Sequence, residues 1–171
     1  MITIREDIQE THTFSLLVDN EAGVLARVIG LFSGRGYNIE SLTVAEVDKD
    51  SHTSRITIVS KGSPKTIDQI KRHLERLVPV HKVTDLTIEG PSVEREMALI
   101  KVLYTNENKE EILRLVEIYR AKIVDTTDKS FVFELTGAMD KINSFIDLLR
   151  PLGLNELSRT GLAAIARGSK N

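Results

Sequence analysis

The segment DNEAGVL, residues 19–25, carries the residue types best suited to holding a small ligand. It joins a segment with strand periodicity to one with helical periodicity. Gly23 lets a ligand approach the backbone closely, and the first amides of the following helix have no intrahelical partner and carry a partial positive charge. Asn20 adds both a hydrogen-bond donor and an acceptor. This combination suits a carboxylate. Spacing alone leaves a second interpretation open, in which Asn20 caps the helix and Gly23 permits the turn.

Other patterns predict neither a catalytic nor a metal site. The chain has no cysteine, and its four histidines lack the helical spacing of a zinc site. No Gly-x-Ser-x-Gly sequence or complete phosphate-binding loop is present. Paired acids such as Glu94 and Glu96 lie in linker or amphipathic contexts that explain them as solvated surface. One enzymatic alternative remains open, in which Asp125 and Asp128 of the second module form an acid–base site.

Composition restricts the partners and the compartment. The 171 residues include 41% hydrophobic and 28% charged side chains, which is typical of a folded globular protein. The net charge of −2 shows no basic excess for a nucleic-acid backbone. No apolar run approaches the roughly 18 residues of a membrane span, and the polar N-terminus does not resemble a secretory signal. We therefore expect a cytoplasmic protein that contacts neither nucleic acid nor membrane.

Hydrophobic periodicity predicts two modules with the same order of elements. In the first, we expect a strand at 13–18, a helix at 23–35, a hairpin of 39–47 with 53–60, a helix from 64 to 77 and a strand at 80–88. In the second, we expect a strand at 97–104, a helix at 109–119, a hairpin of 123–127 with 131–135, a helix at 138–149 and a last strand within 157–166. The prediction is an α+β protein with two ferredoxin-like βαββαβ modules in tandem, at 11–89 and 93–168. Because each module is small, we also expect an oligomer.

Three stretches of sequence resemble one known family. Residues 19–48, DNEAGVLARVIGLFSGRGYNIESLTVAEVD, resemble the N-terminal ACT domain of the acetolactate synthase small, regulatory subunit. The DNEAGVL turn is common to many amino-acid-binding ACT domains, whereas RGYNIESLTVA at 35–45 is specific to this subunit family. VEREMALIKV at 93–102 and SRTG at 158–161 resemble the family's C-terminal domain. The resemblance extends over nearly the whole chain.

This resemblance implies a non-catalytic regulator of branched-chain amino-acid biosynthesis. Such a subunit binds a branched-chain amino acid, typically valine, activates a separate catalytic subunit and imposes feedback inhibition on it. The cofactors implied, thiamine diphosphate, Mg²⁺ and FAD, belong to that large subunit and not to this chain. The family's effector site corresponds to Asn20, Gly23, Val24 and Leu25 of one ACT domain. Asn38 and Ile39 of the second copy complete it across a homodimer interface. The alternative function is a free-standing ACT-domain sensor that controls transcription or another enzyme.

Overall fold

The computed structural model describes residues 8–168, which form two compact units. The first unit contains residues 8–93 together with 162–168, and the second contains residues 94–161. The second unit is therefore an insertion into the chain of the first. No helix in the described part of the chain is long and apolar enough to cross a membrane.

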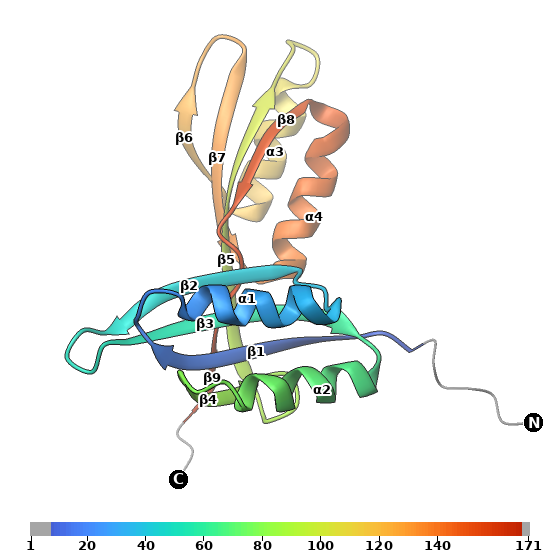
Figure 1. Cartoon of the computed structure of the whole chain (residues 1–171). Coiled ribbons are helices and arrows are strands. Elements are labelled where there is room, and N and C mark those ends of the chain that lie inside the picture. The colour runs from blue at the N-terminus through green and yellow to red at the C-terminus, as the bar shows by residue number, and fades with distance from the viewer. Residues whose placement is uncertain (1–7, 169–171) are drawn as a thin grey trace, which may run out of the picture. The chain divides into compact units, whose positions relative to one another are not determined.

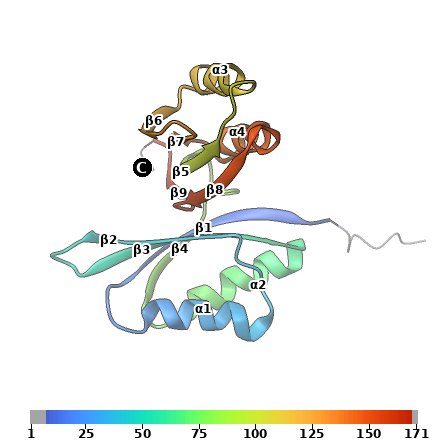
Figure 2. The same ribbon diagram turned by 90° about the horizontal axis from the view of Figure 1, so that it is seen from above.

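The first unit is a four-stranded antiparallel sheet with two helices on one face (Figures 1 and 2). Its elements are β1 (Glu10–Asp19), α1 (Val24–Arg35), β2 (Ser41–Asp48), β3 (Thr53–Gly62), α2 (Pro64–Glu75) and β4 (Val80–Asp85), and the short β9 (Ala163–Ala166) joins it from the end of the chain. The strands lie in the order β2-β3-β1-β4, so β2 and β4 are the edges. The predicted βαββαβ order is confirmed.

The core of the first unit lies between the sheet and its two helices. Alternation along β1 directs Phe14, Leu16 and Val18 toward the helices, where at most 1% of each is exposed. The helices contribute Val24, Val28, Phe32, Ile67, Ile70 and Leu74. Each such buried side chain stabilises the fold by about 1.5–3 kcal/mol. Ser15 and Leu17 therefore point to the opposite face of the sheet.

Local signals explain where α2 begins and how it is held. Ser63 Oγ accepts a hydrogen bond from Thr66 N at 3.3 Å, and Pro64 occupies the first helical turn, where its missing N–H costs nothing. On the same helix, His73 Nδ1 lies 3.1 Å from Tyr37 Oη, which follows α1. This contact ties the two helices together at the end of α1.

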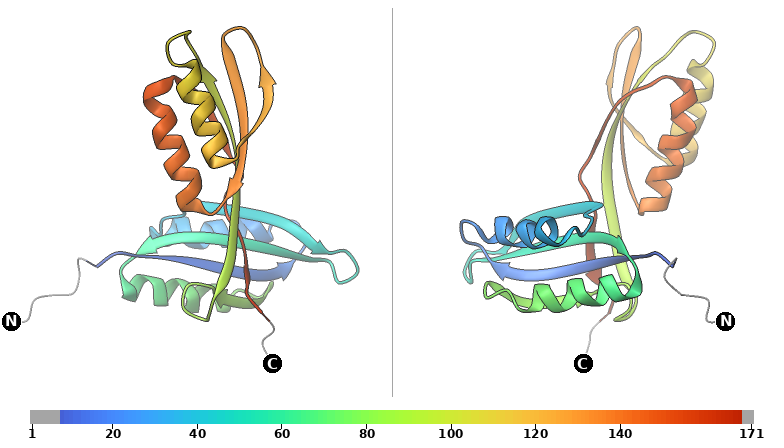
Figure 3. Two further views of the ribbon diagram at one scale, coloured as in Figure 1. Left: turned by 180° about the vertical axis from the view of Figure 1, so that it is seen from behind. Right: turned by 45° about the vertical axis from the view of Figure 1, so that its right-hand side comes forward.

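The second unit repeats the βαββαβ order, as predicted. Its elements are β5 (Ser92–Leu103), α3 (Lys109–Tyr119), β6 (Lys122–Thr126), β7 (Ser130–Gly137), α4 (Met139–Leu149), the 3₁₀ turn η2 (Arg150–Leu152) and β8 (Leu154–Arg159). The strands lie in the order β6-β7-β5-β8, β9 also pairs with β5, and α3 and α4 pack on one face (Figure 3). Glu96 on β5, 4% exposed, accepts two hydrogen bonds of 2.7 Å from Arg159 on β8. This hydrogen bonding raises the pKa of Arg159.

The last predicted strand is in fact two strands, β8 and β9, and both of them pair with β5. β8 pairs antiparallel with β5, from Ala98 opposite Arg159 onward, and completes the second unit. The chain then turns at Gly161, whose φ of 84° few other residues adopt. We expected residues 162–168 at the end of the second module. Their contacts instead place them in the first unit. Hydrogen bonds to β2, described below, fix this segment there.

Candidate functional site

The junction between β1 and α1 is an exposed turn held by its backbone. Asp19 N donates to Pro79 O at 2.9 Å, and Asn20 N donates to His52 O at 2.7 Å. Gly23 precedes the first helical residue with φ of 87°, in the left-handed region. A Cβ at Gly23 would have no atom within 4 Å. The backbone thus favours glycine here, and the space around it is open to a ligand.

The side chain of Asn20 does not cap the helix. Its Nδ2 donates to Glu46 Oε1 on β2 at 3.0 Å, and no side chain caps the N-terminus of α1. The capping interpretation of the sequence is therefore wrong. Glu46 was not singled out by sequence analysis, because its partner is 26 residues away and no local pattern links the two. Its carboxylate orients the amide of Asn20 at the edge of the turn.

The next two predicted residues have different surroundings. Val24 is 6% exposed and belongs to the core of the first unit, so only its backbone can face a ligand. Leu25 is 36% exposed and presents an apolar side chain to the surface beside the turn. Of the two, Leu25 is available for contact with an aliphatic ligand.

Asn38 and Ile39 lie between the other end of α1 and the start of β2. Gly36, with φ of 68°, ends the helix, and its amide bonds back to Phe32 O and Ser33 O. The backbone oxygen of Asn38 accepts a hydrogen bond of 2.6 Å from Ser60 Oγ, which fixes this loop against β3. The rest of Asn38 is exposed, and Ile39 is half-buried.

One chain does not bring the six predicted residues together. Asn20 to Leu25 lie at the N-terminal end of α1, whereas Asn38 and Ile39 follow its C-terminal end. A helix of 12 residues is about 18 Å long at roughly 1.5 Å per residue. A single small ligand cannot bridge the two groups within one copy of the chain.

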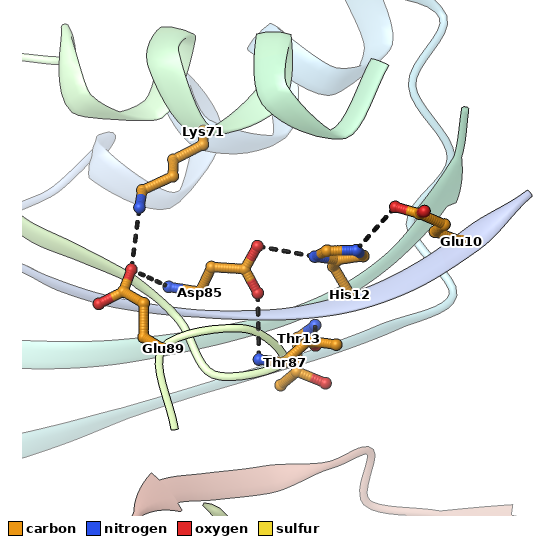
Figure 4. Close-up of polar contacts among 7 residues, drawn as sticks. All are labelled: Glu10, His12, Thr13, Lys71, Asp85, Thr87 and Glu89. Atoms are coloured by element: carbon orange, nitrogen blue, oxygen red, sulfur yellow. Dashed lines mark hydrogen bonds and ion pairs between the residues drawn. The ribbon is translucent and has the colours of Figure 1, made fainter. Parts of the chain in front are cut away.

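A partly buried polar cluster connects β1, α2 and the loop after β4 (Figure 4). His12, 6% exposed, lies between Asp85 Oδ2 at 2.7 Å and Glu10 Oε2 at 3.2 Å. Lys71 on α2 contacts Glu89 at 2.9 Å, and this hydrogen bond raises the pKa of Lys71. No buried side-chain polar atom among the described residues lacks a partner. The cluster therefore acts as internal bonding between elements, not as an open site.

Asp125 and Asp128, the acids of the enzymatic alternative, do not line the hollow described below in the second unit. Asp125 is exposed on β6, and Asp128 is exposed in the turn that follows. A hollow of about 200 Å³ in this unit is lined by Leu99, Lys101, Val132, Glu156 and Ser158 instead. Among the described residues, no three His, Asp or Glu side chains are placed to hold a metal ion.

Comparison with known proteins identifies both parts of the chain. Residues 14–82 match the family described as "AHAS small subunit-like ACT domain", and residues 95–168 match "Small subunit of acetolactate synthase". A probable acetolactate synthase small subunit of Archaeoglobus fulgidus is 48% identical over 93% of this chain and 98% of its own length. The acetolactate synthase small subunit of Haemophilus influenzae is 46% identical over 92% and 96%.

A solved structure agrees with the sequence comparison. The acetolactate synthase small subunit of Thermotoga maritima is 45% identical to this chain and covers 94% of it, with 99% of its own chain matched and a TM-score of 0.81. Sequence and fold therefore agree over almost the full length. The chain belongs to the family of acetolactate synthase small subunits, and its first unit is an ACT domain.

Proposed function

We propose that this chain senses a branched-chain amino acid, with valine as the expected effector, and thereby regulates a separate catalytic subunit of acetolactate synthase. The observation that carries the proposal is Gly23, which has a left-handed backbone, stands in open space and immediately precedes α1. Family membership supplies the regulatory role, and this turn supplies a place for an amino acid.

The chemistry of the turn suits an amino-acid effector. The carboxylate lies at the N-terminus of α1, where the helix dipole favours negative charge by about 0.3–1 kcal/mol or more. The amide of Val24 donates to Glu21 O at 3.3 Å, so binding exchanges this bond for one to the ligand or uses the neighbouring amides. Asn20, oriented by Glu46, binds the polar end of the amino acid. An isopropyl group packs against Leu25 and against Ile39 of a second copy. Serine offers no such apolar contact, so it binds weakly.

A homodimer through β2 joins the two halves of the site. β2 is an edge strand, and Val44 and Val47 on it are 43% and 52% exposed. If two β2 edges pair antiparallel, the start of each strand lies beside the end of the other. Asn38 and Ile39 precede the start of β2, and Asn20 bonds to Glu46 near its end. Such pairing brings Asn38 of one copy toward Asn20 and Gly23 of the other, so the dimer forms two equivalent sites.

The regulatory output is exerted on the catalytic subunit. We propose that thiamine diphosphate, Mg²⁺ and FAD are held there and that this chain holds none of them. The chain activates the partner, and the effector reverses that activation by changing how two ACT domains pair. Such coupling amounts to about 1–3 kcal/mol in known allosteric systems.

The first test is a calorimetric titration of the purified chain. L-valine, L-leucine and L-isoleucine are compared with D-valine and L-serine, and saturable binding of an L-branched-chain amino acid is expected. Acetolactate formation by the catalytic subunit is then measured with and without this chain and the effector. A folded dimer that binds none of the ligands contradicts the sensor role. A dimer that binds valine without changing the catalytic subunit supports a free-standing sensor instead.

Complementation tests whether the site is shared between copies. Gly23→Asp and Asn38→Ala chains, each alone, form dimers in which both sites are damaged. A mixed dimer of the two contains one doubly damaged site and one intact site. We expect each variant alone to lose valine binding and the mixed dimer to recover one high-affinity site per dimer. No recovery in a verified mixed dimer shows that the residues do not meet across the interface.

A further inference from the structure

The C-terminal segment 162–167 crosses the face of the first sheet that the helices leave open. Leu162 N donates to Ser41 Oγ at 2.9 Å, and Thr43 Oγ1 donates to Leu162 O. At the other end, Arg167 N donates to Pro91 O at 2.8 Å. Leu162 is only 1% exposed. The segment is thus anchored at both ends, on β2 and beyond β4.

A cavity of about 280 Å³ lies between this segment and the sheet. Its lining consists of Ser15, Leu17, Arg55, Lys82, Thr84, Leu86, Ile165 and Ala166. The register explains why two cations meet here. Leu17 on the central strand pairs with Arg55 on one side and Lys82 on the other. Since strands lie about 4.8 Å apart, the two basic residues are separated by about 10 Å and both side chains can reach a ligand between them.

The two cations have no carboxylate partner in the described part of the chain. Every ion pair of residues 8–168 within 4.0 Å involves other basic residues. The guanidinium of Arg55 instead donates to Ser15 Oγ at 2.6 Å, and Ser15 is only 3% exposed. Placing a half-buried guanidinium against a neutral hydroxyl leaves its charge uncompensated. The cavity is therefore electropositive at its polar end.

We propose that this cavity binds a small organic carboxylate. The carboxylate lies between Arg55 and Lys82, and the hydroxyl of Thr84 is within the same lining. Leu17, Leu86 and Ile165 supply apolar walls for a short aliphatic chain. The volume is at the lower end of small-molecule pockets, which run from about 300 to 1,000 Å³, so an acid of about four or five carbons fits. The site lies on the opposite face of the sheet from α1 and differs from the effector site proposed above.

Isobutyrate is a suitable probe for the full-length chain, because it has a carboxylate and a branched chain but no amino group. The δ1 methyl resonance of Ile165 is followed by NMR during titration with sodium isobutyrate, isobutyramide and inorganic phosphate. We expect saturable shifts with isobutyrate, at least tenfold weaker binding of the other two, and at least tenfold weaker isobutyrate binding in Lys82→Met. Lys65→Met, an exposed charge-matched change on α2, should bind as the wild type does.

Further variants separate this site from general effects. Arg55→Lys keeps the charge and should retain most of the affinity, whereas Arg55→Met should lose it while remaining folded by circular dichroism. Gly23→Asp should leave isobutyrate binding unchanged. The proposal is overturned if Lys82→Met binds isobutyrate as tightly as Lys65→Met does, if isobutyramide binds equally well, or if phosphate binds more tightly than isobutyrate.

Discussion

Replacement of Gly23 by aspartate tests the effector site with a change whose energetic parts can be separated. The left-handed backbone at this position, with φ of 87°, costs a residue with a side chain about 1 kcal/mol. No steric cost is added, because a Cβ meets no atom within 4 Å. For a unit of this size, about 1 kcal/mol lowers the melting temperature by roughly 4–8 °C. The protein therefore stays folded at room temperature.

The effect on binding is larger than the effect on stability. If the ligand carboxylate binds at the first turn of α1 as proposed, a carboxylate on residue 23 would lie on the order of 5 Å from it. With an effective dielectric constant of about 20, two negative charges at that distance repel by about 3 kcal/mol. Since 1.4 kcal/mol corresponds to a factor of ten, valine should bind more than 100-fold more weakly.

Gly23→Asn is the matched control. Asparagine has the same shape, tolerates the left-handed region as aspartate does, and carries no charge. Both variants are titrated with L-valine by calorimetry, and their unfolding is followed by circular dichroism. We expect similar melting temperatures and at least a tenfold difference in affinity between them. Equal affinities in the two variants would refute the placement of the ligand carboxylate at this turn.

Three further predictions concern stability. In Gly153→Ala the new Cβ would lie 2.2 Å from Leu103 O, and φ is 106°, so denaturant titration should show a loss of more than 2 kcal/mol; a smaller loss contradicts this geometry. His12→Ala removes the side-chain partner of Asp85, which is 1% exposed, and should cost about 3 kcal/mol, whereas His12→Asn, which can still donate, should cost less than half of that. The pKa of His73 is lowered below its ordinary 6.5, mainly by burial and then by two nearby arginines. The stability that comes from the neutral ring is therefore complete above about pH 6.5 and is lost as the pH falls through the lowered pKa. His73→Gln should flatten the dependence of stability on pH between 7 and 5, and parallel curves for variant and wild type would count against this assignment.

The predictable parts of the fold are those with a local periodic signal. The strand predicted at 13–18 is confirmed as part of β1, along which Phe14, Leu16 and Val18 alternate and point into the core. The Gly23 turn was also predictable, because its glycine, the end of β1 and the start of α1 are adjacent in sequence. Val24, which the resemblance places in the effector site, has a core side chain, so only its backbone could serve that site.

Features that depend on distant contacts carried no signal in the sequence. The hydrogen bond between Asn20 and Glu46 joins the end of β1 to β2. The local sequence pattern indicated that Asn20 could cap the helix instead. The segment around β9 is short and apolar, which fits either sheet. Its position is set by its pairing with β5 and by hydrogen bonds between Leu162 and residues 119 and 121 positions away. Such pairings can be found only once the topology is known.

The backbone of Leu162 is held by side chains of β2. Its N–H and C=O both bond to side chains at the start of β2, those of Ser41 and Thr43. Asn38 and Ile39 directly precede the same strand, and β2 is the edge at which we propose that two copies pair. Leu162 also directly follows the last residue of the second unit. We propose that a shift of β2 on effector binding would be felt first at Leu162, through these two hydrogen bonds. Coupling between sites requires a contiguous element of this kind that responds to the ligand.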